Sequence, residues 1–143
     1  MDFVRDDGGR ATAGFKGDAA GDCVTRAIAI ATGLPYSEVY DQINKLAKLE
    51  RPRAKGKRSS SRTGVFRKTY DRLLEQLGWN WTPTMAIGQG CKVHLRTEEL
   101  PPGRLIVKVS RHLVAVIDGV IHDLERPDRG GTRCVYGYWT KED

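Results

Sequence analysis

The sequence predicts an α+β fold, with helices in the first half that pack on an antiparallel sheet formed by the second half. Apolar residues recur at helical spacing in three segments before Gly78, which indicates amphipathic helices. After Gly78 the chain breaks into short apolar runs separated by turn residues, which is typical of strands. With 143 residues, 39% of them hydrophobic and 29% charged, the chain is long enough for one domain, residues 1–143, with its own core.

Three helices are expected after an irregular lead-in at residues 1–20. Asp22 is placed to cap the first helix and Gly33 to end it. Ser37 is placed to cap the second helix, whose apolar stripe runs toward Leu49. The three helices are expected at 23–32, 37–49 and 63–77.

Strands are expected mainly in the second half of the chain. Ser110-Arg111 and Asp118-Gly119 are the expected two-residue turns, and Asp-Gly in particular favours a hairpin. Residues 97–100 are expected to form a single helical turn. The expected strands are one near Phe3 and then 79–83, 93–95, 104–109, 112–117, 120–124 and 133–139.

The turn at Asp118-Gly119 determines which side chains of the last hairpin share a face. It pairs Ile117 with Val120, and residues that lie opposite each other in a hairpin point to the same face. Because side chains alternate along each strand, His112 and Asp123 fall on one face as diagonal neighbours. A slip of one residue would separate them.

Cys23, His112 and Asp123 are the candidate catalytic residues. A thiol in the first turn of a helix lies at the positive end of the helix dipole, which favours the nucleophilic thiolate. Asp22 opposes this effect, so a partner base is required, and His112 is the candidate. Asp123 would fix the tautomer and the orientation of the imidazole.

The order of cysteine, histidine and aspartate on helix and strands resembles the papain-like cysteine peptidase superfamily. The resemblance covers residues 18–139, and Asp22-Cys23 at the start of an Ala-rich helix looks most like small bacterial peptidases that process double-glycine leaders. The chain is also similar to phage and prophage proteins that carry an Asp-Cys-Val-x-Arg-Ala-Ile-Ala helix and a later Ser-x-His-x-Val-Ala-Val hairpin.

The resemblance implies a papain-like fold and a hydrolase of the cysteine (thiol) protease type. Cys23 would be the nucleophile, His112 the general base and acid, and Asp123 the orienting residue. The expected reaction is cleavage of an amide or isopeptide bond in a protein or peptide. One departure concerns the oxyanion hole: Gly17 stands where the family places a glutamine. Lys16 and the backbone N–H of Cys23 are the candidate substitutes, and without one the site would be weak or inactive.

A basic run between residues 51 and 62 provides a second candidate site. The net charge of +6 is concentrated there, since the run has six basic residues and no acidic one. It is interpreted either as a solvated loop or as a contact for nucleic acid or an acidic protein, through phosphate or carboxylate groups. The rival function is therefore a papain-like protein of phage or mobile-element type, weak or inactive in catalysis, that binds a host protein or nucleic acid. The basic residues are Arg51, Arg53, Lys55, Lys57, Arg58 and Arg62.

The three cysteines bear on the compartment and on metal binding. An odd, sparse set argues against a disulfide framework and for a reducing compartment, which predicts a cytoplasmic protein. Cys91 and Cys134 are expected to be buried structural thiols. Cys91-x-x-His94 has the spacing of a zinc ligand pair but lacks convincing further ligands, so neither a metal nor a cofactor is expected. The sequence shows no apolar run of membrane-spanning length and no signal peptide, so no membrane partner is expected.

Overall fold

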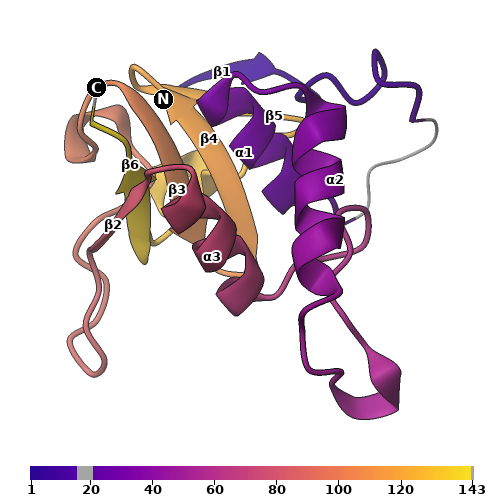
Figure 1. The fold of residues 1–143 in the computed structure, drawn as a ribbon. Helices are drawn as coiled ribbons and strands as arrows, with labels where there is room; N and C mark the ends of the chain where they lie inside the picture. Colours follow the sequence, from indigo (N-terminus) through magenta and orange to yellow (C-terminus); the bar gives the residue numbers. More distant parts are fainter. Residues whose placement is uncertain (16–20, 143) are drawn as a thin grey trace.

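A computed structural model describes residues 1–15 and 21–142 (Figure 1). Within these residues three α-helices pack on a six-stranded sheet, which confirms the predicted α+β class. None of the helices in this part of the chain has the length and apolar character needed to cross a bilayer. The helices are α1 Cys23–Thr32, α2 Tyr36–Ala47 and α3 Arg67–Gln76, with single 3₁₀ turns at Ala54–Gly56, Thr97–Glu99 and Arg129–Gly131. The strands are β1 Asp2–Arg5, β2 Asn80–Pro83, β3 Arg104–Val109, β4 His112–Ile117, β5 Val120–Asp123 and β6 Gly137–Thr140.

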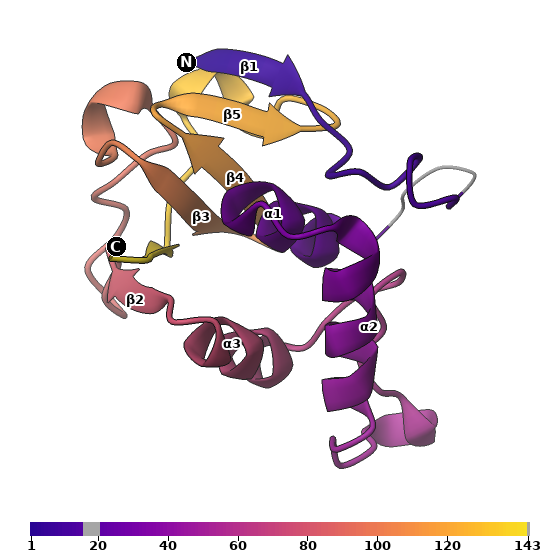
Figure 2. The ribbon, with the colours of Figure 1, turned by 45° about the horizontal axis from the view of Figure 1, so that its top comes forward.

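The sheet has the strand order β1-β5-β4-β3-β6-β2 (Figure 2). The predicted hairpin register is confirmed, because Ile117 pairs with Val120 across an Asp118-Gly119 turn in which both residues have positive φ. The prediction of a wholly antiparallel sheet is wrong at one edge, where β1 pairs with β5 in parallel. A parallel neighbour must come from a distant part of the chain, and hairpin signals cannot reveal it.

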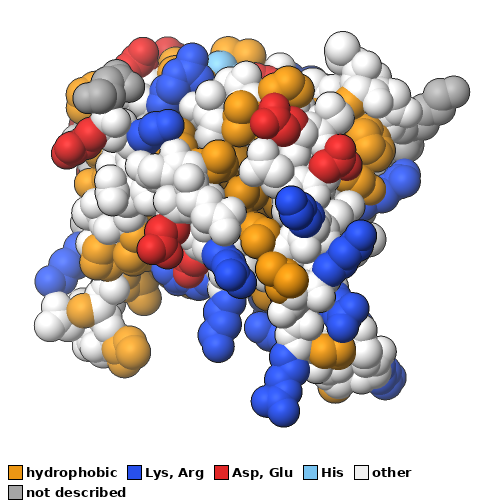
Figure 3. Space-filling view, in the orientation of Figure 1, with side chains coloured by type: hydrophobic (Ala, Val, Ile, Leu, Met, Phe, Trp, Pro, Cys, Tyr) orange, Lys and Arg blue, Asp and Glu red, His pale blue; other side chains and the backbone are white. Residues whose placement is uncertain are grey.

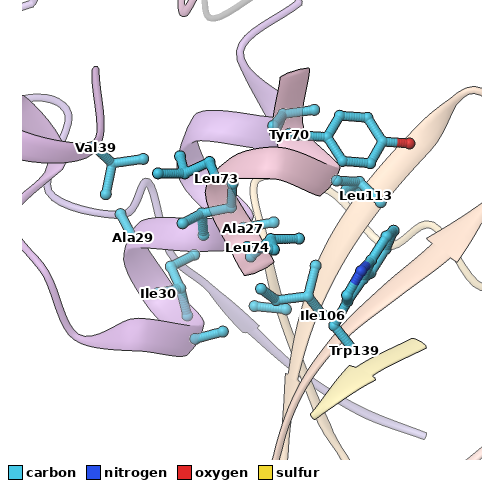
Figure 4. Close-up of a cluster of buried hydrophobic side chains, with 14 of the residues drawn as sticks. Ala27, Ala29, Ile30, Val39, Tyr70, Leu73, Leu74, Ile106, Leu113 and Trp139 are labelled. Carbon is cyan, nitrogen blue, oxygen red and sulfur yellow. The ribbon is translucent and has the colours of Figure 1, made fainter. Parts of the chain in front are cut away.

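The three helices cover one face of the sheet and enclose the main core (Figure 4). α1 is apolar on most of its circumference because it packs against both the sheet and α2, and Ile28 is fully buried. Leu113 and Ala115 of β4 point into this core, while Val114 and Val116 point into a second apolar cluster on the opposite face. β4 is therefore a central strand buried on both faces, which explains its continuous apolar sequence.

Two of the helices begin at positions that differ from the prediction. α2 follows Pro35, so Ser37 lies inside the helix and does not cap it. Proline is favoured near helix starts because its φ is already helical and it lacks the N–H that would be unpaired there. α3 begins only at Arg67, because the preceding residues form a turn closed by the Ser60–Gly64 bridge. Leu49 lies beyond the end of α2 and is 67% exposed, so it is not part of the core.

Cys91 and Cys134 form a disulfide, with Cα atoms 5.8 Å apart, so the prediction of two separate buried thiols is wrong. Backbone pairing between the two segments aligns them: Leu95 N–H donates to Arg133, and Val135 N–H donates to Val93. Because the two cysteines are 43 positions apart in the chain, the sequence gives no indication that they lie close together. The disulfide also removes the argument for a reducing compartment that rested on sparse cysteines.

Candidate active site

Cys23 is the first residue of α1, and its thiol is free and only partly buried. The helix begins here as predicted and ends at Gly33, whose φ of 77° and hydrogen bond to Ala29 form a left-handed C-cap. The first N–H groups of a helix have no partner within the helix, and they give its start a positive partial charge. The thiol thus lies where a thiolate is favoured.

Asp22 precedes the helix, but its side chain makes no capping hydrogen bond, contrary to the prediction. The buried carboxylate instead accepts hydrogen bonds from Arg26 Nε at 2.7 Å and from the Tyr36 hydroxyl at 2.9 Å. Arg10 Nε lies 3.6 Å away on the other side. Two guanidinium groups therefore compensate the charge of Asp22, which the sequence argument had set against the Cys23 thiolate.

His112 and Asp123 meet at the end of the β4–β5 pair, as the register predicted. Nε2 of His112 lies 2.6 Å from Oδ2 of Asp123, a short hydrogen bond to a buried carboxylate. The other carboxylate oxygen accepts hydrogen bonds from Arg26 and from the Leu124 N–H, each at 2.7 Å. Nδ1 is thus the His112 nitrogen that remains for Cys23, whose thiol lies within hydrogen-bonding reach of the imidazole.

The charges of the three groups support one another. Burial raises the pKa of Cys23, but the hydrogen bond and the charge of His112, together with the Leu113 N–H and Arg26, outweigh it and lower the pKa below the usual range. Burial lowers the pKa of His112, yet its contacts with Asp123 and Cys23 raise it to about 9. The pKa of Asp123 is lowered, because His112 and Arg26 outweigh its burial. Both shifts favour the charged forms, the Cys23 thiolate and the His112 imidazolium.

Arg26 is the functional residue that the sequence argument missed. Its buried guanidinium bridges Asp22 and Asp123, with 2.7 Å to each carboxylate, and so links the start of α1 to the end of β5. The sequence carries a signal for it: from residue 24 to residue 31, Arg26 is the one charged residue in a segment otherwise made of apolar residues and Thr25. A charge on a buried helix requires a partner, although the sequence does not say which one.

The oxyanion hole of a cysteine hydrolase needs hydrogen-bond donors near the thiol. Lys16, one of the two candidate donors, lies outside the described residues, as does Gly17. The N–H of Cys23 is the donor that the start of α1 provides.

The basic run lies apart from the three catalytic candidates. Residues 51–58 are exposed beyond α2, and Lys and Arg side chains gather over this side of the molecule (Figure 3). Arg53 stacks on the Phe66 ring at 3.7 Å, and both line a pocket of about 380 Å³ with Arg51 and Leu49. The end of the run is anchored, because the buried Ser61 accepts a hydrogen bond from Thr25 of α1 through its carbonyl. Lys55, Lys57, Arg58 and Arg62 are exposed and are not in the lining of that pocket.

Comparison with known proteins returns no match, whether the chain is set against protein-family models, curated proteins or solved structures.

Proposed function

We propose that the protein is a small cysteine hydrolase of papain-like fold that cleaves an amide or isopeptide bond in a protein or peptide. One observation carries the proposal: a free thiol at the start of a helix faces an imidazole whose far nitrogen is held, at 2.6 Å, by a buried carboxylate. A structural cysteine needs no such arrangement, whereas a nucleophilic one requires both the base and its orienting group.

The reaction follows from these positions. The Cys23 thiolate attacks the carbonyl carbon, and the electrons of the C=O bond move to oxygen, where the Cys23 N–H stabilises the charge. The His112 imidazolium donates its proton to the leaving amine as the C–N bond breaks, which leaves a thioester. His112 then takes a proton from water, the hydroxide attacks the thioester, and the thiolate leaves. An amine in place of water would give transglutaminase-like chemistry at the same thioester.

Asp123 and Arg26 keep the imidazole in its working orientation throughout. Asp123 accepts the Nε2 proton of His112, which directs Nδ1 to the thiol. Arg26 holds the second oxygen of Asp123 and so prevents the carboxylate from rotating.

The test is the rate of Cys23 alkylation by iodoacetamide as a function of pH. Without reductant Cys91 and Cys134 stay in their disulfide, so Cys23 is the thiol that reacts. Because the Cys23 pKa is lowered, rapid labelling should persist well below about pH 8.5, the ordinary pKa of a thiol, and should disappear only as the pH falls through the lowered value. In turnover, activity should fall again above about pH 9, where His112 loses its proton.

His112→Ala should return the labelling profile to that of an ordinary thiol. His122→Ala is the matched control, because His122 is also partly buried and also contacts a carboxylate, Asp6 at 3.2 Å. The hydrolase proposal would be refuted if the wild-type alkylation profile matched that of an ordinary thiol, or if His112→Ala left the profile unchanged.

The second candidate function is binding through the basic run. The lining of the pocket there combines apolar side chains, Leu46 and Phe66 among them, with Arg51, Arg53 and Arg72, which suits an acidic protein segment with an apolar anchor. Nucleic acid is the alternative ligand, and its affinity should fall steeply with salt. A phage or mobile-element origin belongs to this proposal as something that the resemblance alone suggests.

A further inference from the structure

A large pocket borders the His112–Asp123 pair and is lined mainly by arginines. Its volume is about 930 Å³, and both His112 and Asp123 lie in its wall. Six arginines line it against two carboxylates, those of Asp123 and Glu125. We call it the arginine pocket, and its arginines are Arg5, Arg26, Arg111, Arg126, Arg129 and Arg133.

Only part of this positive charge is compensated. Arg26 is held by Asp22 and Asp123, and Arg126 is paired with the buried Asp128 at 3.1 Å. Arg5 donates to a neutral acceptor, the carbonyl of Leu124. Arg111 and Arg129 are exposed and have no ion pair among the residues that the structure describes, so several guanidinium groups are available to a bound anion.

Arg133 indicates where an anion is most favourable. Its Nε is buried and has no hydrogen-bond partner among the described residues, although its terminal nitrogens donate to backbone carbonyls. Burial and the nearby charge of Arg129 both lower the pKa of Arg133, which means that the two guanidinium groups repel each other. A carboxylate between them would remove the repulsion and would accept their hydrogen bonds in the bidentate geometry that arginine favours.

Two arginines of the pocket also have an unusual backbone conformation. Arg111 and Arg129 have φ values of 56° and 49°, a region that residues other than glycine seldom adopt. Backbone strain of this kind often gathers at functional sites.

We propose that the arginine pocket binds acidic side chains of the substrate peptide on the leaving-group side of the scissile bond. This inference rests on the proposed function, because the side is assigned from the role of His112. The imidazole that protonates the leaving amine must lie beside the leaving group, and the same imidazole forms part of the wall of the pocket. Cys23 itself is not in the lining, so in this proposal the peptide that continues past the broken bond reaches the arginine pocket beyond His112.

The lining favours an acidic peptide over nucleic acid. Single-stranded nucleic acids are bound by basic grooves combined with aromatic side chains on which bases stack. No Phe, Tyr or Trp is found among the described residues that line this pocket. Glu125 and Asp123 also interrupt the positive surface, which a continuous row of phosphates would not tolerate well.

The experiment measures binding of a fluorescein-labelled hexaglutamate peptide to the full chain by fluorescence anisotropy, with hexaglutamine as the neutral probe. Wild type should bind hexaglutamate more tightly than hexaglutamine, and the double variant Arg111→Gln/Arg129→Gln should weaken hexaglutamate binding by about tenfold or more, because two charged hydrogen-bond donors are lost. Both residues are exposed, so the variant should fold.

Arg51→Gln/Arg53→Gln is the matched control, because it removes two arginines from the other basic pocket. Hexaglutamate binding that is lost in this control and kept in the pocket variant would overturn the proposal, as would equal binding of hexaglutamate and hexaglutamine. Preferential binding of a hexathymidylate to the arginine pocket would overturn it in favour of nucleic acid.

Failure of this inference is distinguishable from failure of the proposed function. Peptide binding does not require a reactive thiol, so the anisotropy is measured also with Cys23→Ala. If Cys23 is alkylated with the pH profile of an ordinary thiol but hexaglutamate still binds, the hydrolase alone is rejected. If rapid alkylation of Cys23 persists at low pH as expected but hexaglutamate does not bind, the acidic substrate alone is rejected.

Discussion

At the scale of single residues, the site depends on how buried charges are paired. Asp22, Arg26 and Asp123 are all buried, and each would be costly without the others. Arg26 is central to this cluster because one planar guanidinium contacts two carboxylates. In the proposed mechanism it acts through Asp123 on His112 and, in turn, on the thiol, so its proposed role is positioning and not catalytic.

Arg26→Lys should therefore affect both stability and the thiol. A lysine keeps the charge but cannot bridge both carboxylates in the same geometry, so one buried acceptor loses its partner at a cost of about 1–3 kcal/mol. Urea denaturation measures this loss. The pH profile of Cys23 alkylation should also move toward that of an ordinary thiol, which a purely structural role would not cause.

Arg72→Lys is the control for this substitution, since Arg72 is exposed on α3 and should change the free energy of unfolding by no more than about 0.5 kcal/mol. An unchanged alkylation profile in folded Arg26→Lys would refute the positioning role.

At the scale of elements, the site joins one helix start to one hairpin. α1 carries the thiol, and the β4–β5 hairpin sets the separation of His112 from Asp123. The Asp118-Gly119 turn fixes that register at the other end of the hairpin, where φ of Gly119 is 79°. A Cβ on Gly119 would also lie 2.5 Å from Cγ2 of Thr97, so this position of the turn has no room for a larger residue unless Thr97 moves.

Gly119→Ala should destabilise the protein more than Gly33→Ala does. Gly33 has nearly the same φ, 77°, but nothing lies within 4 Å of the position that a Cβ would occupy there, so it reports the backbone strain alone, about 1 kcal/mol. The Thr97 contact should add about 1–3 kcal/mol, the usual cost of overpacking. Thermal or urea unfolding of both variants gives the difference, and equal losses would show that Thr97 moves aside freely.

At the scale of the whole molecule, distant segments complete the sheet and its loops. β1 runs parallel to β5, and the Asp6 N–H donates to the Asp123 carbonyl, so the N-terminal segment supports the strand that carries Asp123. The Cys91–Cys134 disulfide ties the segment before β3 to the segment before β6. Its second cysteine follows Arg133 directly, which connects the disulfide to the wall of the arginine pocket.

Removal of the disulfide should lower the stability without affecting the thiol pair. A loop of this length gives about 4 kcal/mol in the chain-entropy treatment, as an upper value. Cys91→Ser/Cys134→Ser and reduced wild type should show the same lowered denaturation midpoint, and dithiothreitol should not lower that of the variant further. Identical midpoints for oxidised wild type and the variant would contradict this expectation.

The sequence by itself determined the features that depend on neighbouring residues. The helix that starts at Cys23 and ends at Gly33 follows from apolar spacing and a glycine C-cap, and the pairing of Ile117 with Val120 follows from an Asp-Gly turn. Those two local elements were enough to predict the contact between His112 and Asp123, because register propagates along a hairpin.

The tertiary structure alone decided what depends on segments far apart in the chain. It brought β1 beside β5, joined Cys91 to Cys134, and placed Arg26 between its two carboxylates. It also gathered arginines from Arg5 to Arg133 around one pocket, whereas the sequence drew attention to the contiguous run at 51–62. Periodicity and turn residues report local conformation, but long-range pairs form only when the core packs, and no spacing rule encodes which partners then meet.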